Sequence, residues 1–272
     1  MWLSVTKHEK TILTKLVAVQ ADGFKDAGST PAASTNFKMV YLFDIDGTLT
    51  PPLQRMEQNF LFFFLSWSKN KKVYLVGGSD KKKIESQLPS SVIKRCAGMF
   101  CCMGNEFWQG KELIYKNKFD PPKTLIEMLS SFQINTKSPT LGKAPFIEYR
   151  TGMLNFTTVG RNIGLAQRNI YYEWDKKSQE RNEIAKKVEE TFPNLEAKLG
   201  GQISIDIQPK GYNKSQASQW VRENIDENIF FAGDKCFEGG NDYDIYLDVK
   251  NKGGTAIQVE GWEHTVRVLS NH

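Results

Sequence analysis

The stretch VYLFDIDGTLT, residues 40–50, joins an apolar run directly to two aspartates. Residues Val40 to Phe43 are strand formers, and Gly47 marks where the predicted strand gives way to a turn. While the backbone stays extended, Asp44 and Asp46 face the same side. Two carboxylates held this close repel each other unless a cation lies between them or one of them is protonated. The stretch therefore predicts a buried strand that ends at a charged functional site.

Strand and helix patterns alternate along much of the chain from Met39 onward. The first part predicts strands at 40–45 and 72–79, helices near 54–69 and 80–89, and a third strand in AGMFCCMGN. After Lys214 the alternation resumes with a helix at 215–224, a strand in NIFFAGD, then GGTAIQV and a last helix. Strands that alternate with helices are typical of an α/β domain with a parallel sheet.

The middle of the chain follows another pattern. In GQISIDIQP three isoleucines alternate with Ser204 and Asp206, and in APFIEYR the residues Glu148 and Arg150 share one face. Such alternation predicts an antiparallel sheet with one buried face. Between these segments, apolar residues recur every four positions over Ile184–Phe192, as in an amphipathic helix. The predicted fold class is an α/β, Rossmann-like core with a parallel sheet, plus an inserted α+β cap with an antiparallel sheet.

The change of pattern predicts where the domains begin and end. We expect a flexible tail at 1–38, the first part of the core at 39–116, the cap at 117–211, and the second part of the core at 212–272. The tail is small, polar and without periodicity. Because Met39 stands directly before the first strand, our hypothesis is that it is the functional start.

Composition argues against several classes of protein. The 272 residues carry a formal net charge of +5 without a basic block, which argues against nucleic-acid binding. The apolar run FLFFFLSW at 60–67 is far shorter than the about 20 residues of a membrane-spanning helix, so no membrane partner is expected. Cysteines Cys96, Cys101, Cys102 and Cys236 fit no zinc motif, and we expect reduced thiols in a cytoplasmic protein.

Further charged and polar groups lie near predicted strand ends or helix starts. Ser79 ends the second strand, Lys214 opens a helix, and Asp234 ends NIFFAGD. Ligands of open α/β sheets bind at the carboxyl ends of the strands, so these groups are expected to share one crevice with Asp44 and Asp46. Three converging carboxylates favour a hard divalent cation such as Mg²⁺. One aspartate could then act as a nucleophile toward phosphorus, with a second moving the proton.

These motifs resemble those of a known superfamily. DIDGT, the serine of GGS, Lys214 and GDKCFEGGND are similar to the four motifs of the haloacid dehalogenase phosphotransferases. The wider resemblance is to the eukaryotic-type α-phosphomannomutases. It rests on DIDGTLTPP, VGGSD, IEYRTGMLN, VGR, YYEWDKK, GGQISIDIQPKGYNK and GDKCFEGGNDYDIY, in that family's order. It covers about residues 39–260, and the cap motifs are its most specific part.

The resemblance implies a role for each of these residues. Asp44 would be the phosphorylated nucleophile and Asp46 the general acid/base, with Ser79 and Lys214 contacting the phosphoryl group. The implied Mg²⁺ ligands are Asp44, the backbone carbonyl of Asp46, and Asp234, and Asp242 would support them. The resemblance also implies a second cation loop at Tyr246–Asn251, with Tyr246 and Asp248 as its ligands. The implied substrate-binding residues of the cap are Arg150, Arg161, Arg168, Ser204 and Asp206. Arginine suits this role because its planar fork matches phosphate oxygens.

The function that the resemblance implies is a magnesium-dependent phosphomannomutase. It would interconvert mannose 6-phosphate and mannose 1-phosphate through phospho-Asp44 and a hexose 1,6-bisphosphate, which also serves as activator. Its product would feed GDP-mannose synthesis, and the cap would form a homodimer. The sequence leaves the choice between mannose and glucose open.

Two alternatives remain at the level of sequence. A sugar-phosphate phosphatase would share every core residue, and it stays open because Leu53 stands where the family usually has arginine. Arg55 follows two positions later, but on a helix it would point about 200° away. A non-catalytic binding protein is disfavoured because a pure binder needs no nucleophile at Asp44.

Overall fold

The computed structural model describes residues 39–52, 54–225 and 227–272. The predicted tail at 1–38 and Leu53 therefore lie outside the described residues, whereas Met39, the proposed start, is the first described residue. Arg55 is described and lies before the first core helix rather than on it, so the expected helical offset from Leu53 is wrong.

The core is built on a seven-stranded sheet with the order β11-β10-β1-β2-β3-β4-β5. Its strands are β1 (Met39–Phe43), β2 (Lys72–Val76), β3 (Gly98–Cys101), β4 (Glu106–Gln109), β5 (Glu112–Lys116), β10 (Asn228–Gly233) and β11 (Thr255–Gln258). β1 pairs in parallel with both β10 and β2, as the alternation predicted. The sequence did not predict β4 and β5, which extend the sheet as an antiparallel hairpin.

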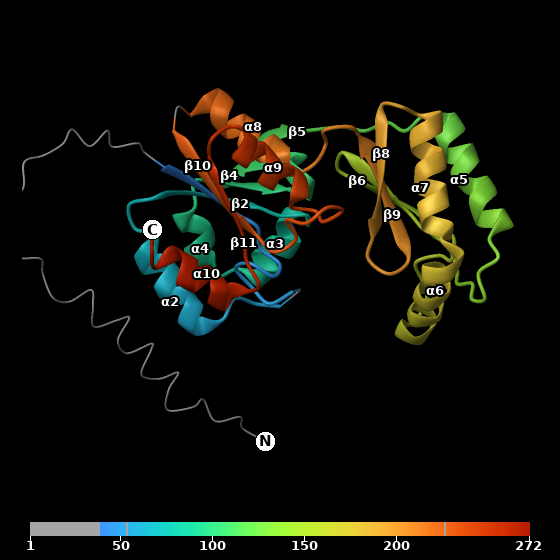
Figure 1. The fold of residues 1–272 in the computed structure, drawn as a ribbon, viewed down its shortest axis with the longest axis horizontal. Helices are drawn as coiled ribbons and strands as arrows, with labels where there is room; N and C mark the ends of the chain where they lie inside the picture. The colour runs from blue at the N-terminus through green and yellow to red at the C-terminus, as the bar shows by residue number, and fades with distance from the viewer. Residues whose placement is uncertain (1–38, 53, 226) are drawn as a thin grey trace, which may run out of the picture. The chain divides into compact units, whose positions relative to one another are not determined.

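Helices cover both faces of the core sheet (Figure 1). One face packs against α2 (Gln58–Trp67), α3 (Lys81–Gln87), α4 (Ser90–Arg95) and α10 (Trp262–Leu269). The other face packs against α8 (Ser215–Asn224) and α9 (Tyr243–Asn251). Tyr41 and Phe43 of β1 face the first layer, whereas Val40 and Leu42 face the second. Burial on both sides explains why β1 is apolar throughout rather than alternating.

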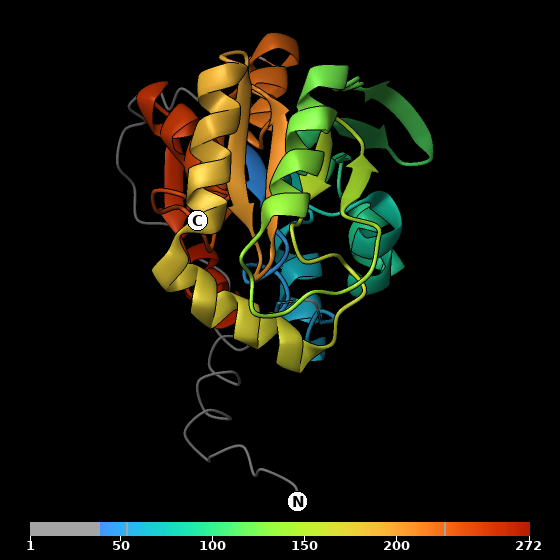
Figure 2. The ribbon, with the colours of Figure 1, turned by 90° about the vertical axis from the view of Figure 1, so that its right-hand side faces the viewer.

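The cap is built on a four-stranded antiparallel sheet with the order β6-β7-β9-β8. Its elements are β6 (Ile147–Arg150), β7 (Met153–Phe156), β8 (Leu195–Gly200), β9 (Ser204–Pro209), α5 (Lys123–Asn135), α6 (Leu165–Ser178) and α7 (Glu180–Thr191). α5 and α7 cover one face, where Ile205 and Ile207 are buried as their alternation predicted (Figure 2). Tyr149 of β6, which shares a strand face with the partly buried Ile147, is 63% exposed, so the alternation of APFIEYR does not bury its whole apolar face.

The opposite face of the cap sheet carries polar side chains. Directly opposed residues of antiparallel strands point to the same face. Glu148 of β6 lies opposite Asn155 of β7, which lies opposite Asp206 of β9, which lies opposite Lys198 of β8. We call these four residues the polar row.

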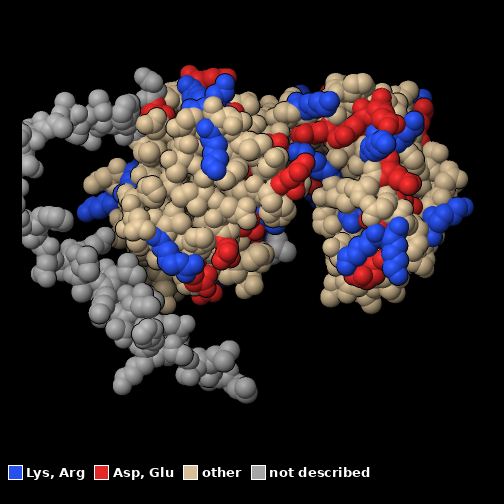
Figure 3. Space-filling view, in the orientation of Figure 1, with Lys and Arg blue, Asp and Glu red and all other residues tan. Residues whose placement is uncertain are grey.

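The described residues were expected to contain no membrane span and no basic block. No helix among them is long and apolar enough to cross a membrane, and α2, which contains the apolar run, has only 10 residues. On the face drawn in Figure 3, the described Lys and Arg residues are interspersed with Asp and Glu.

Candidate active site

Two neighbouring interior strands of the core sheet, β1 and β10, bring two aspartates together. Asp44 directly follows β1 and Asp234 directly follows β10, and the two strands run parallel in a register that pairs Phe43 with Ala232. The chain turns away from β1 at Gly47, which has a φ of +84° and lies against the Asp234 carboxylate. A side chain at residue 47 would overlap that carboxylate. Gly47 therefore allows the turn after β1 to pass beside Asp234.

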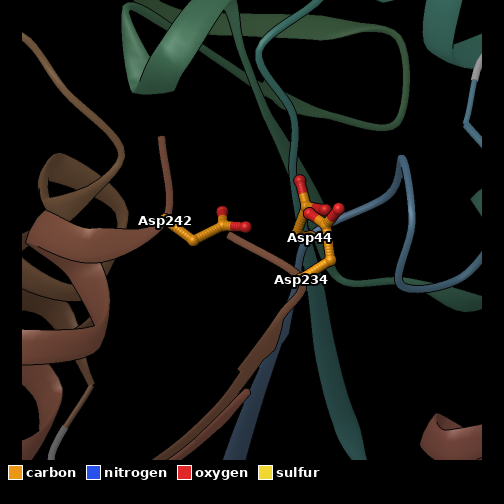
Figure 4. Close-up of side chains that lie close together, drawn as sticks. All are labelled: Asp44, Asp234 and Asp242. Carbon is orange, nitrogen blue, oxygen red and sulfur yellow. The ribbon is translucent and has the colours of Figure 1, made fainter. Parts of the chain in front are cut away.

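A third aspartate completes a cluster of carboxylates (Figure 4). Asp242 stands at the N-cap of α9, and one ligand oxygen each from Asp44, Asp234 and Asp242 lies within 4.8 Å of the others. Within the described part of the chain this is the one such group of His, Cys, Asp and Glu side chains. All its donors are carboxylate oxygens, which is the chemistry of a Mg²⁺ site, so the residues fit that ion.

Lys214 is fully buried beside this cluster. Its Nζ donates to Asp44 Oδ1 at 2.5 Å and to Asp242 Oδ1 at 2.7 Å. Asp242 Oδ2 accepts from the backbone N–H of Lys235 at 3.1 Å. Both oxygens of Asp242 are thus engaged by the protein, which suits the supporting role that was expected for it. Thr48 donates to Asp44 Oδ2 at 3.1 Å, so the candidate nucleophile is held at both oxygens.

Burial and like charge dominate the electrostatics of the cluster. Desolvation, reinforced by the charge of Asp242, raises the pKa of Asp44 to about 7 although Lys214 opposes the rise. Burial alone would lower the pKa of Lys214, but Asp242 and Asp44 outweigh it and raise that pKa. Desolvation also raises the pKa of Asp234. Lys214 and the partly exposed Lys235, whose Nζ lies 3.9 Å from Asp234 Oδ2, are two ammonium groups beside three carboxylates. The cluster therefore keeps a deficit of positive charge that a divalent cation would fill.

Asp46 and Ser79 are the other predicted core residues. Asp46 is half-buried, and its Oδ1 accepts from Gln87 Nε2 of α3 at 2.6 Å. Ser79 follows β2 and lines a cavity of about 780 Å³ whose wall also includes Cys102 and Arg150. The cavity therefore joins the predicted phosphoryl-contacting serine of the core to a predicted arginine of the cap.

The cap arginines gather around Glu148. Its Oε2 accepts from Arg150 Nε at 3.0 Å, and Arg161 donates to the same oxygen. Arg168 donates to the backbone carbonyl of Arg161 at 3.3 Å, which places the third arginine beside them. We call Arg150, Arg161 and Arg168 the arginine cluster.

The two predicted sugar contacts of the cap lie on the polar face of its sheet. Asp206 Oδ1 accepts from Asn155 Nδ2 at 2.5 Å, and Arg161 donates to Asn155 Oδ1 at 2.7 Å. Ser204 donates to the carbonyl of Gly200 at 2.6 Å within the β8–β9 hairpin. Asp206 is therefore linked to the arginine cluster through Asn155.

The predicted second cation loop at Tyr246–Asn251 is helical, which corrects the expectation of a loop. Ile245 and Val249, four residues apart, are buried in the core, and this spacing fixes a helix. Asp248 accepts from Ser218 and Arg222, and Tyr246 accepts from Lys250 at 2.7 Å. Neither Tyr246 nor Asp248 belongs to the described carboxylate group.

Sequence reasoning missed several partners in the site. Thr48 lies four residues after Asp44, and its place in DIDGT was an available signal. Glu148 shares a strand face with Arg150, but the pattern gave no reason to expect two arginines on one carboxylate. Gln87 and Asn155 carried no signal, because their contacts depend on how distant segments are placed.

Comparison with known proteins places this site in a family. A family model described as eukaryotic phosphomannomutase matches residues 61–271. The chain belongs to the eukaryotic phosphomannomutase family. A phosphomannomutase of Dendrobium officinale is 36% identical over 225 residues, which cover 80% of this chain and 88% of that protein. A phosphomannomutase of Arabidopsis thaliana is 36% identical over 223 residues, which cover 79% and 89%.

Solved structures support the fold of this phosphomannomutase family member. A sugar phosphatase of haloacid dehalogenase subclass IIB matches with a TM-score of 0.54 and 17% identity, covering 86% of this chain and 98% of that one. The chain is thus an enzyme of the phosphomannomutase type on a haloacid dehalogenase fold. The enzyme family implies a sugar-phosphate substrate, and the carboxylate cluster suits a divalent metal such as Mg²⁺.

Proposed function

We propose that this enzyme interconverts mannose 6-phosphate and mannose 1-phosphate through phospho-Asp44 and a hexose 1,6-bisphosphate. A mutase that adds phosphate to either end of one sugar needs two phosphate positions. The carboxylate cluster with Lys214 supplies one in the core, and the arginine cluster supplies the other in the cap. One cavity is lined by Ser79 of the core and by Arg150 of the arginine cluster, and this shared wall is the observation that carries the proposal.

The chain's own groups divide the work of phosphoryl transfer. Asp44 attacks phosphorus, forming a bond to one carboxylate oxygen while the bond from phosphorus to the donor oxygen breaks. Asp46 moves the proton of the sugar hydroxyl that departs or attacks. Lys214 stays close to Asp44 throughout and offsets negative charge on the phosphoryl group, and Ser79 contacts that group.

Metal binding is assigned to the same cluster. Mg²⁺ would be held by Asp44, Asp234 and the backbone carbonyl of Asp46, with Asp242 supporting Asp44 through Lys214. When bound, the ion stabilises charge that develops on the phosphoryl oxygens. A second cation near Tyr246 and Asp248 stays a prediction from the family resemblance.

The cap binds the phosphate that is not being transferred. Arg150, Arg161 and Arg168 would hold that phosphate in place of their present partners, and Ser204 and Asp206 would contact sugar hydroxyls. After the first transfer the bisphosphate turns round and returns its other phosphate to Asp44. Slow hydrolysis of phospho-Asp44 requires that the closed cap exclude water. We further propose a cytoplasmic homodimer formed through the cap, whose product enters GDP-mannose synthesis.

The test follows both products of one reaction. The enzyme is incubated with Mg²⁺, mannose 1-phosphate and a trace of glucose 1,6-bisphosphate, and mannose 6-phosphate and free phosphate are measured together. The proposal predicts mannose 6-phosphate with little free phosphate. Free phosphate that matches the loss of substrate, without the isomer, would support the sugar-phosphate phosphatase instead. Glucose 1-phosphate in parallel defines the sugar preference.

A further inference from the structure

The polar row of the cap ends in an ion pair with the core. Its last member, Lys198 of β8, donates from Nζ to Asp244 Oδ2 at 2.5 Å. Asp244 lies in the first turn of α9, in the core. A second acidic group, Glu196, also faces Lys198, with its Oε2 at 3.5 Å from Nζ. A cap strand is therefore joined to a core helix by opposite charges that are 46 residues apart in the chain.

The two ends of this contact belong to the two parts of the proposed site. Lys198 lies directly opposite Asp206 on the cap sheet, and Asp206 is linked through Asn155 to Arg161. Asp244 is two residues after Asp242, which binds Lys214 and belongs to the carboxylate cluster. The ion pair thus connects the cap sheet, which carries the predicted substrate-binding residues, with α9 of the core, whose N-cap Asp242 belongs to the carboxylate cluster.

A second contact joins the other side of the cap sheet to the core. Thr151, in the turn after β6, donates to Glu106 Oε1 of β4 at 2.7 Å. Thr151 follows β6 and Lys198 lies on β8, so a contact with the core stands on or next to each of the two edge strands of the cap sheet. Contacts at both edges fix an angle between cap and core, whereas one contact would leave a hinge.

We propose that Lys198 and Asp244 form a latch that holds the cap in register with the core, so that the arginine cluster faces Asp44 during phosphoryl transfer. Both are positioning residues and neither needs to touch the substrate. A partly exposed ion pair is too weak to decide whether the chain folds, but it is strong enough to bias two arrangements of a cap. The consequence for the reaction rests on the proposed function; the latch itself does not.

Charge reversal and charge exchange test the latch. The variants are Lys198→Glu, Asp244→Lys and the double exchange, each with Mg²⁺ present. The first readout is the radius of gyration from X-ray solution scattering, which requires no turnover. Each single reversal should enlarge it, and the double exchange should return it to the wild-type value. The matched control is Lys186→Glu, which removes a cap ion pair with Glu190 on the exposed side of α7.

The second readout is the division of products. Each single reversal should lower kcat/KM for isomerisation about tenfold. This factor is expected when the attraction of one partly exposed ion pair is replaced by a repulsion of similar strength. It should also raise the share of free phosphate, because a displaced cap admits water to phospho-Asp44. The double exchange should recover isomerisation to within about threefold of wild type. A purely structural role predicts lower stability without this change in product ratio.

The outcomes separate the latch from the proposed function. Unchanged scattering in both single variants, or a double exchange no better than either single, would overturn the latch. If a charge reversal prevents folding, Lys198→Met is measured in its place. A folded Lys198→Met variant with the same radius of gyration as wild type would also overturn the latch. A wild-type enzyme that produces only free phosphate would refute the mutase while leaving the scattering test intact.

Discussion

Asp44 is predicted to destabilise the metal-free protein at neutral and alkaline pH. Burial and Asp242 raise its pKa from an ordinary value of 3.8 to about 7. The difference is about 3 pKa units, equivalent to ~4 kcal/mol between the two protonation states. Between those two values the folded state binds more protons at Asp44 than the unfolded state. Stability therefore falls as pH rises through this window and levels off above about pH 7.

Asp44→Asn removes this penalty while keeping an oxygen that accepts from Lys214. In metal-free solution we expect the variant to gain ~3 kcal/mol more, relative to wild type, at pH 8 than at pH 5. Urea unfolding in the presence of a chelator, followed by fluorescence at both pH values, measures the difference. Asp80→Asn is the matched control, because Asp80 caps α3 through the Lys83 N–H and asparagine caps helices equally well.

A gain from Asp44→Asn that is the same at pH 5 and pH 8 would refute this electrostatic account. Added Mg²⁺ should stabilise wild type far more than the variant, because the ion fills the charge deficit that Asp44 helps to create. Equal stabilisation of both proteins would mean that Mg²⁺ binds elsewhere.

Three further predictions concern the same region and a buried thiol. Lys214→Met leaves buried carboxylates without their partner, so the free energy of unfolding at pH 8 should fall by about 3–5 kcal/mol, as measured in urea. Gly47→Ala places a side chain at a strained φ and in overlap with the Asp234 carboxylate. Calorimetric titration should therefore show that the affinity for Mg²⁺ falls at least about tenfold, and an unchanged affinity would contradict the assigned geometry. Burial raises the pKa of Cys236, which is 4% exposed, to about 12, so this thiol should react slowly with a disulfide reagent at pH 8 and rapidly once unfolded; fast labelling of Cys236 in the native protein would contradict its burial.

Local patterns predicted those elements in which the buried and exposed side chains alternate regularly along the segment itself. The helix at 215–224 has the observed bounds, and the alternation of GQISIDIQP identified a strand with a buried face. The run before Asp44 is a strand that helices cover on both faces, which is why it is apolar throughout. These segments carry their periodicity within a few residues, so no knowledge of their partners is needed.

The hairpin of β4 and β5 was missed because its environment is not expressed in its own sequence. Glu106 is a buried charge inside a short strand, and two of its three partners, Thr151 of the cap and Lys116 of the paired strand, come from other segments, while Trp108 lies two residues on. Residues 112–114 of β5 are exposed, so no buried face marks the strand. Burial that depends on tertiary partners leaves no local period to detect.

The contacts that tie the site together were also beyond local reasoning. The residues of the polar row share a face only because of the register of four strands from different parts of the cap. The segment Tyr246–Asn251 shows the reverse problem, since family resemblance suggested a loop where apolar spacing gives a helix.

The measurement that tests the central claim most directly is the mass of the acid-quenched enzyme after mixing with Mg²⁺ and glucose 1,6-bisphosphate. The account predicts that wild type gains the mass of one phosphoryl group and that peptide mapping places it on Asp44. Asp44→Asn should gain nothing, and chasing the labelled wild type with mannose 6-phosphate should remove the group as sugar bisphosphate. A phosphoryl group on another residue, or none despite active isomerisation, would contradict the account.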